Sequence, residues 1–535
     1  MKRYKLLYLV AGVASVLMTG CNDMENTPSN KFTDNSFWNS TEKAQYVVNM
    51  AYSQMYNAGR MWQDESLSDN VFDGRNVTDP RAIRKGMGTP SLELFKNEWK
   101  DLYGGIKTCH VFLEKVDLVP GMNVAVKARM IAEIRFIRAV NYARMIRIFG
   151  GVILRDETNG VDSEGQKDKA RATEAESWDF VLKDLEFAAR HLPKEWDSKW
   201  DGRLTKGAAY AYMCRTALFA KRWDVAITAA DEIKKLNKYD LMDNYEDVFK
   251  VAGNKEIIFS IAYKIPDMPH YFDRYFAPDG KQGIRRAVPT SELVDSYDMA
   301  DGTPFSWSGS MANDPYVGRE PRFYASIIYN GATWKEKKIY TYVDAENGFA
   351  AYRDNMNPGE KQTVTGYFIR KYLQENNADF DDKGSDQFWI EMRYAEVLLN
   401  LAEALAEQDY SKNQDDALEA LNEVRERVNL PKRTTEEAPD KDSFMKLLRK
   451  ERICELAFEG FRYWDLRRWR LAGEVIDGKQ AHGTKITKKD DNTYTYEQVS
   501  CDDNINRFFP ERYYLLPIPV DELQNNPLCE NNAPW

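Results

Sequence analysis

Apolar residues recur at intervals of three and four along several long stretches of the chain, which is the period of an amphipathic helix. In residues 123–149, one predicted helix face carries Val126, Met130, Ile134, Ile137, Asn141, Met145 and Ile148. The pair Gly150-Gly151 then predicts the end of that helix. The same pattern predicts further helices over 41–56, 92–117, 174–191 and 204–221.

Two pairs of neighbouring helices have the pattern of helical hairpins. Residues 208–221 and 224–236, separated by a turn at Arg222, are rich in small residues, as in tetratricopeptide repeats. A second pair is predicted over 395–406 and 417–428. Each hairpin has an apolar face that it cannot bury alone, so hairpins stack on one another. The predicted fold class is therefore mainly α, with a scaffold of tetratricopeptide-like hairpins.

Two long segments lack this period. Residues 57–91 carry turn residues and are predicted to form a long loop. Residues 263–389 hold clusters of Gly, Pro, Asn and Asp, with short β-like runs at 325–329 and 338–343. This segment has 23 aromatics in 127 residues, or 18%, against 13% for the whole chain. We therefore expect a loop-rich, partly β insertion whose surplus aromatics include recognition residues.

The first residues have the features of an export signal. Lys2, Arg3 and Lys5 precede an apolar run over 6–18, which is too short to span a bilayer. The run ends in Leu17-Met18-Thr19-Gly20-Cys21, which resembles the lipobox of bacterial lipoproteins, with methionine where leucine is commoner.

The lipobox resemblance implies a signal peptide over 1–20, acylation of Cys21 and a polar tether over 21–40. The acidic sequence Asn22-Asp23-Met24-Glu25 is similar to the surface-export signal of Bacteroidetes lipoproteins. The alternative is an ordinary secretory signal with an incidental cysteine.

Composition and charge narrow the classes of ligand. The 535 residues are 43% hydrophobic and 30% charged, so the chain is not compositionally disordered. Its net charge is -10, and loss of the three basic signal residues would make it -13. A general nucleic-acid binder requires a basic face, which this balance disfavours. The acidic net charge favours a neutral ligand, because an anionic ligand requires local clusters of arginine or lysine.

The cysteines do not form a recognisable framework. Apart from Cys21 there are five, and none belongs to a C-x-x-C pair. Cys109 and Cys214 lie on apolar stripes and are predicted to be buried. A disulfide between Cys501 and Cys529 is an open alternative.

Motifs of the common enzyme classes are mostly absent. The four histidines are far apart, and there is no H-E-x-x-H, nucleophile elbow, P-loop or dinucleotide fingerprint. We therefore predict no catalytic residues, no metal site and no cofactor. A glycosidase stays open, because paired carboxylates are defined by their separation in space.

The densest pattern of charge lies in residues 451–469. Arg452, Glu455 and Glu459 are spaced by three and four, so their side chains share a helical side. One interpretation is an acid–base site. The favoured interpretation is a partly buried network of ion pairs that joins helices.

The same region carries a family resemblance. Glu451-Arg452 and the run from Phe458 to Trp469 strongly resemble the C-terminal signature of SusD/RagB lipoproteins. The run from Arg393 to Ala404 and the segment from Tyr514 to Pro519 are similar to the same family. The last five residues, Asn531-Asn532-Ala533-Pro534-Trp535, depart from its usual ending. In the N-terminal half, Phe37-Trp38, Trp99, Tyr103 and Ile106 also fit.

The resemblance implies a division of the chain and a function. It implies an N-terminal helical region over 41–262, the aromatic-rich insertion over 263–389 and a C-terminal helical region over 390–535. Such proteins are lipid-anchored at the surface of the outer membrane. They capture an oligosaccharide or polysaccharide without cleaving it, and they cover a SusC-like TonB-dependent transporter as a lid.

A shallow sugar site needs aromatic platforms beside hydrogen-bonding side chains. We expect these in the two irregular segments, although each residue has the alternative of filling a loop core or capping a turn. The candidates are Trp62, Asp73, Arg75, Asn76 and Arg81 from the first segment and Tyr271, Tyr275, Trp307, Trp334 and Tyr340 from the second. Alternative functions are RagB-like capture of peptides, a surface glycosidase, and a helical scaffold without a small ligand.

Overall fold

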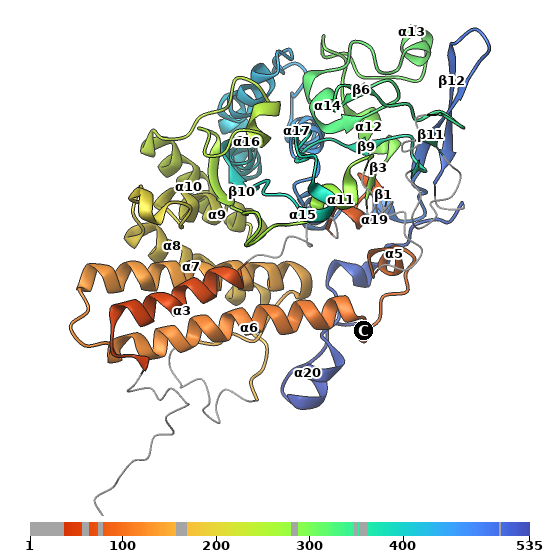
Figure 1. Ribbon diagram of the computed structural model, residues 1–535. Coiled ribbons are helices and arrows are strands. Elements are labelled where there is room, and N and C mark those ends of the chain that lie inside the picture. Colours follow the sequence, from red (N-terminus) through yellow and green to blue (C-terminus); the bar gives the residue numbers. More distant parts are fainter. Residues whose placement is uncertain are drawn as a thin grey trace, which may run out of the picture.

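The computed structural model describes residues 37–55, 64–72, 79–156, 168–279, 287–346, 351–352, 362–501 and 504–535. The predicted acylation site Cys21 lies outside these residues. Helices dominate the described chain, and its strands form two-stranded pairs (Figure 1). The prediction of a mainly α fold is confirmed.

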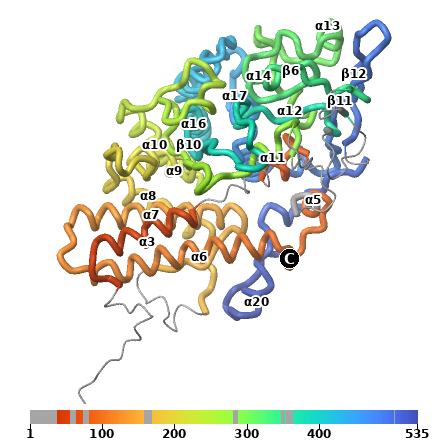
Figure 2. Tube along the Cα trace, in the orientation of Figure 1, coloured from red at the N-terminus to blue at the C-terminus, as the bar shows by residue number. Residues whose placement is uncertain are grey.

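A stack of long helices forms one side of the molecule. Helices α3, α6 and α7 lie side by side, and α8, α9, α10, α16 and α17 follow, each packed against the one before it (Figures 1 and 2). The stack comprises α3 (Thr41–Ser53), α6 (Glu93–Lys115), α7 (Val124–Phe149), α8 (Glu174–His191), α9 (Lys206–Phe219), α10 (Trp223–Leu236), α16 (Tyr394–Arg427) and α17 (Lys441–Glu455).

Local sequence explains where these helices begin and end. The Asn123 side chain accepts hydrogen bonds from the backbone N–H groups of Ala125 and Val126 and so caps α7. Thr173 and Glu176 form a capping box at the start of α8. Helix α7 ends at Gly150, whose φ of 74° is a conformation that suits glycine.

The second predicted hairpin corresponds to α16. Its backbone departs from helical geometry at Asp409 and Asn413, which separates an apolar first half from a second half. Helix α16 contacts α10, although some 150 residues separate the two helices along the chain. The C-terminal region therefore continues the helical stack that the N-terminal region begins.

The segment between α10 and α16 contains short helices as well as the expected loops and strands. Strand β4 lies inside the predicted β-like run 325–329, whereas the run 338–343 is strand only at Lys338. The elements are β2 (Ile257–Ile261), α11 (Phe272–Phe276), β3 (Val288–Pro289), α12 (Ser291–Ser296), α13 (Gly309–Asn313), α14 (Pro321–Ser326), β4 (Ile327–Ile328), β5 (Thr333–Trp334), β6 (Lys337–Lys338), β7 (Ala351–Tyr352), β8 (Gln362–Thr363), β9 (Phe368–Ile369), α15 (Phe380–Lys383) and β10 (Trp389–Arg393).

Strand pairing fixes the insertion to the rest of the chain. Strands β2 and β10 are antiparallel, with Ile261 opposite Trp389, so the two ends of residues 263–389 lie side by side. Strand β1 (Val71–Phe72) pairs with β3, with Val71 opposite Pro289. The structure therefore brings the two irregular segments of the sequence together.

A β-hairpin from the C-terminal region completes this half of the molecule. Strands β11 (His482–Lys488) and β12 (Tyr494–Ser500) stand at its edge beside α13 (Figure 1). Their side chains share a hydrophobic core with the insertion. The remaining elements are α5 (Asp79–Arg84), α18 (Arg462–Arg468), α19 (Ala472–Ile476), α20 (Val520–Asn525) and 3-10 turns at Val116–Leu118, Ser198–Trp200, Glu246–Phe249 and Glu511–Tyr514.

None of the five cysteines of the described chain forms a disulfide, and all five are buried. This confirms the burial predicted for Cys109 and Cys214. The suggested disulfide between Cys501 and Cys529 is absent, because Cys501 belongs to the core of the insertion and Cys529 to the core of the helical stack.

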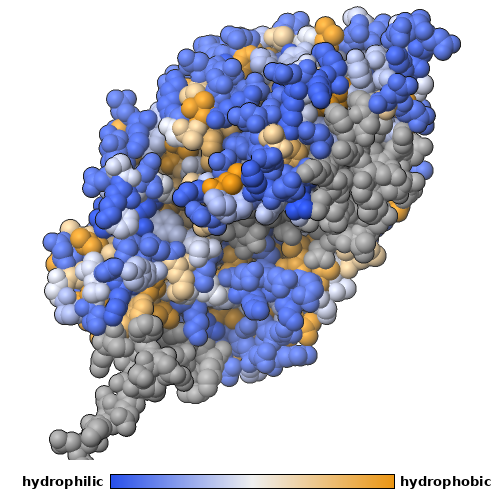
Figure 3. Space-filling view, viewed as in Figure 1, coloured by the Kyte–Doolittle hydropathy of each residue, from blue (hydrophilic) through white to orange (hydrophobic). Residues whose placement is uncertain are grey.

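The surface is mostly hydrophilic on the face shown in Figure 3, with scattered apolar residues. Within the described ranges, no helix combines the length and the apolar character needed to cross a membrane.

Candidate functional site

Six half-buried aromatic side chains form two neighbouring runs of ring contacts where the insertion meets the β11–β12 hairpin. We call this set the aromatic strip. Two of its members precede α13, two follow β6 and two lie on β12. The aromatic strip consists of Phe305, Trp307, Tyr340, Tyr342, Tyr494 and Tyr496.

The ring contacts run in two branches that β12 joins. In the first branch, the Trp307 ring centroid lies 5.3 Å from Phe305 and 6.1 Å from Tyr496. In the second, the Tyr342 centroid lies 5.7 Å from both Tyr340 and Tyr494. Residues i and i+2 of a strand share a face, so Tyr494 and Tyr496 carry the strip from one branch to the other.

Buried contacts hold the strip in place. The Trp307 Nε1–H group donates to Asp295 Oδ2 at 2.9 Å. Burial raises the pKa of Asp295 to about 6, although the hydrogen bond from Trp307 opposes this rise. Behind Tyr496 lies the buried ring of Tyr316, with centroids 5.7 Å apart. A platform fixed in this way loses little side-chain entropy when a ligand binds.

Two of the predicted ligand residues, Trp307 and Tyr340, belong to the aromatic strip. Tyr271 and Tyr275 lie elsewhere, at α11, where Tyr271 is 39% exposed and Tyr275 is half-buried. Trp334 differs from the expected surface platform. It is only 2% exposed, because its ring fills the core of the insertion and its Nε1–H group donates to Asp279 at 3.0 Å.

The side chains of the five candidates from the first irregular segment are not among those that the structure describes. Trp62, Asp73, Arg75 and Asn76 lie outside the described residues. Arg81 lies in α5, but its side chain is not among those described.

The predicted set omitted Phe305, Tyr342, Tyr494 and Tyr496. The last two come from β12, which was not predicted. A signal was present: alternating residues around Tyr494 and Tyr496, after the turn sequence Asp490-Asp491-Asn492, are typical of a hairpin.

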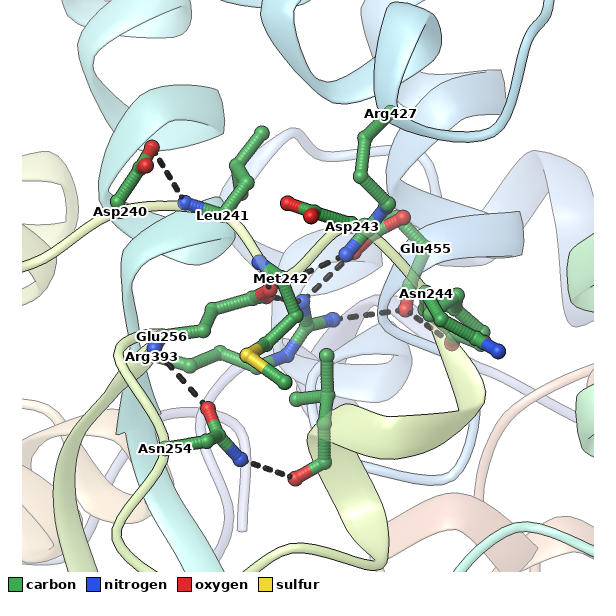
Figure 4. A network of polar contacts seen from close by, with 12 residues as sticks. Asp240, Leu241, Met242, Asp243, Asn244, Asn254, Glu256, Arg393, Arg427 and Glu455 are labelled. Atoms are coloured by element: carbon green, nitrogen blue, oxygen red, sulfur yellow. Dashed lines mark hydrogen bonds and ion pairs between the residues drawn. The ribbon is translucent and has the colours of Figure 1, made fainter.

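The charged pattern of residues 451–469 forms a buried ion-pair network, which confirms the favoured interpretation. Glu455 accepts from Arg393 Nη1 at 2.6 Å and from Arg322 Nη1 at 3.0 Å, and it also pairs with Arg427. Glu256 binds Arg393 and Arg427 at 2.7 and 3.1 Å (Figure 4). The network joins α16 and α17 to β10 and, through Arg322, to α14 of the insertion.

The electrostatics of this network are structural rather than catalytic. Burial alone would raise the pKa of Glu455, but Arg427, Arg393 and Arg322 outweigh it and hold that pKa well below its usual range. A second carboxylate, Glu459, accepts hydrogen bonds from Arg393 and from Lys371, whose Nζ lies 2.6 Å away. A carboxylate that is permanently ionised and enclosed by arginines is a poor proton donor or acceptor.

Arg452 belongs to a separate buried pair, with its Nε 2.8 Å from Asp465 Oδ2. It shares the predicted helical side with Glu455 but not the partners of Glu455. In the part of the chain that the structure describes, no cluster of three or more His, Cys, Asp or Glu side chains could hold a metal ion.

Comparison with known proteins assigns the family. The model of the SusD family matches residues 239–535, which is more than half of the chain. The chain belongs to the SusD family. A second family model, described as starch-binding associating with outer membrane, matches residues 18–218 of this SusD family member. The resemblance seen in the sequence motifs is therefore confirmed.

Relatives of this SusD family member match it along nearly their whole length. SusD-like protein P2 of Formosa agariphila is 26% identical over 568 residues, covering 99% of each chain. A SusD-like protein from Bacteroides fragilis has a crystal structure that is 30% identical, covers 94% of this chain and 99% of its own, and has a TM-score of 0.80. A SusD-like carbohydrate binding protein from the same organism is 29% identical, covers 92% of this chain and 99% of its own, and has a TM-score of 0.79.

Proposed function

We propose that this SusD family member is a non-enzymatic glycan-binding lipoprotein that captures an oligosaccharide or polysaccharide. The observation that carries the proposal is the aromatic strip, which presents six half-buried rings at one edge of the insertion. Carbohydrate binding by a similar protein of Bacteroides fragilis supports it.

The chemistry of the strip suits a sugar chain. A pyranose ring has an apolar C–H face that packs on an aromatic ring and a rim of hydroxyl groups that needs hydrogen-bond partners. Exposed polar side chains border the strip. Lys488 Nζ lies 5.7 Å from the Tyr342 centroid, and burial together with the charge of Asp314 raises the pKa of Tyr496 to about 12. Several sugar units in a row could use the two branches at once.

The proposal extends to the place where capture occurs. Acylation of Cys21 would anchor the chain in the outer membrane facing the cell surface, and several acyl chains bind a bilayer far more firmly than one. Delivery would then go to a SusC-like TonB-dependent transporter. The match to a family described as associating with the outer membrane supports this placement.

The test is a panel of neutral and acidic polysaccharides in affinity gels, with analysis of reducing ends after long incubation. We expect one glycan class to retard the protein, with no release of reducing ends. Retention of peptides in place of glycans would contradict the proposal and favour peptide capture. Steady release of sugar, abolished by one Asp or Glu substitution, would establish a glycosidase.

A further inference from the structure

A cavity of about 490 Å³ lies within the helical stack. Its walls come from the end of α7, the start of α8, the turn between α9 and α10, helices α16, α17 and α18, and the segment around Tyr514. The residues that line it include no member of the aromatic strip and none from 263–389. The volume falls in the range of roughly 300–1,000 Å³ that is typical of small-molecule sites.

The carboxylates of this cavity already have partners. Glu403 accepts from Arg468 Nη2 and from Trp469 Nε1, both at 2.7 Å. Glu174 accepts from the indole of a neighbouring tryptophan, and Glu407 pairs with a lysine. Glu403 and Glu407 are thus paired with cations of the protein itself, whereas the neutral indole leaves the charge of Glu174 in place.

Three guanidinium groups that line the same cavity lack such a partner. Among the described residues, no carboxylate lies within ion-pair distance of Arg147, Arg449 or Arg467. Arg467 is 5% exposed and donates to the carbonyl groups of Ile148 and Tyr514, while its Nε and Nη1 have no partner. Burial lowers the pKa of Arg147 and Arg467, as expected for cations without a counter-ion.

Contacts with aromatic rings offset only part of the free-energy cost of burying these three cations. The guanidinium carbons of Arg147 and Arg467 lie 5.3 and 4.9 Å from the Trp464 ring centroid, and Arg449 lies 5.3 Å from Trp469. A cation–π contact contributes about 0.5–2 kcal/mol, which is less than the cost of burying an unpaired charge. A local surplus of positive charge in a chain of net charge -10 therefore calls for an anion.

We propose that this cavity binds a small ring-bearing organic anion. Its oxyanion, a carboxylate or a sulfate, pairs with Arg147 and Arg449, since guanidinium groups match the geometry of such oxyanions. Its ring packs against the tryptophans of the cavity wall. The site is separate from the aromatic strip and does not depend on glycan binding there.

The test is calorimetry on the full mature chain at low ionic strength. The ring-bearing anions are glucuronate, glucose 6-sulfate and benzoate, and the matched probes are glucose, which lacks the charge, and acetate and inorganic sulfate, which lack the ring. At least one ring-bearing anion should bind ten times more tightly than every matched probe. If none does so, the proposal is overturned.

Substitutions locate the binding. Arg449→Gln, on the half-buried side of α17, should weaken binding of the ring-bearing anion at least tenfold, as should Arg147→Met. The control Arg190→Gln changes an exposed arginine on α8 and should leave it unchanged. Unaltered affinity in a folded Arg449→Gln variant would overturn the proposal, and so would loss of anion binding in a Trp307→Ala/Tyr496→Ala variant of the strip.

Discussion

Single buried carboxyl groups show how strongly the interior of this protein constrains charge. Glu455 stays ionised because three arginines surround it, whereas the buried Glu65 carboxyl group accepts one hydrogen bond within the described chain, from the backbone N–H of Gly460 at 2.8 Å. Burial raises the pKa of Glu65 from 4.5 to about 8, so this carboxyl group is protonated in the folded protein at neutral pH. The two residues have the same side chain, but one is ionised and the other is neutral, and their neighbours decide the difference.

The charge state of Glu65 predicts a pH effect on stability. Between about pH 4.5 and 8 the unfolded chain ionises Glu65 while the folded chain keeps its proton, so this group lowers the free energy of unfolding as pH rises. Glu65→Gln removes that titration. Relative to the parent protein, the variant should gain on the order of 3 kcal/mol in unfolding free energy between pH 5 and 8.

Urea unfolding at several pH values measures this difference. The control is Asp379→Asn, an exposed carboxylate paired with Lys383, which should leave the slope unchanged over the same window. A Glu65→Gln variant whose stability follows the parent at every pH would show that Glu65 is ionised in the folded protein.

At the level of elements, the buried network connects the helical stack to the insertion. Arg393, Arg427 and Glu455 end β10, α16 and α17, and Arg322 belongs to α14. Ion pairs at the ends of elements from both halves fix how those halves are placed. The edge that carries the aromatic strip is therefore held by contacts outside the strip.

Breaking this network should loosen the connection. Glu455→Gln leaves Arg393, Arg427 and Arg322 without a shared counter-charge, and loss of one partner of a buried pair costs about 3–5 kcal/mol. We expect that loss in urea unfolding, together with faster proteolysis within residues 263–389. The exposed pair of Asp379 and Lys383 again provides the comparison, since Lys383→Ala should cost about 1 kcal/mol or less. Equal effects of the two substitutions would contradict this role of the network.

The elements also show what the sequence could reveal. Most of the long helices were predicted from their 3.6-residue period, and the end of α7 from Gly150, because those signals are local. The pairing of β1 with β3 and the contact of α16 with α10 depend on partners far away in the chain, and no local pattern encodes them. For the candidate site, the excess of aromatic residues in the insertion led to the prediction of Trp307 and Tyr340, which belong to the aromatic strip. The same excess led to the prediction of Trp334, which is buried.

At the scale of the whole molecule, anchoring and capture are separate predictions. Cys21→Ala should abolish labelling by a palmitate analogue and move the protein from the membrane fraction to the soluble fraction, because no other acylation site is proposed. Cys109→Ala, at a buried cysteine, is the matched control and should stay membrane-bound. Membrane association and labelling that persist in Cys21→Ala would contradict the proposed anchor.

The proposal of glycan capture by the aromatic strip is tested most directly by calorimetry with the polysaccharide that retards the protein in affinity gels. The comparison is between the parent chain, the Trp307→Ala/Tyr496→Ala variant and a control, Tyr46→Ala, which removes an exposed tyrosine of α3. Loss of two stacking platforms, each contributing about 0.5–1.5 kcal/mol, should weaken binding by about 5- to 150-fold in the double variant and leave the control unchanged. Glycan affinity that is the same in the folded double variant as in the parent would contradict capture by the strip.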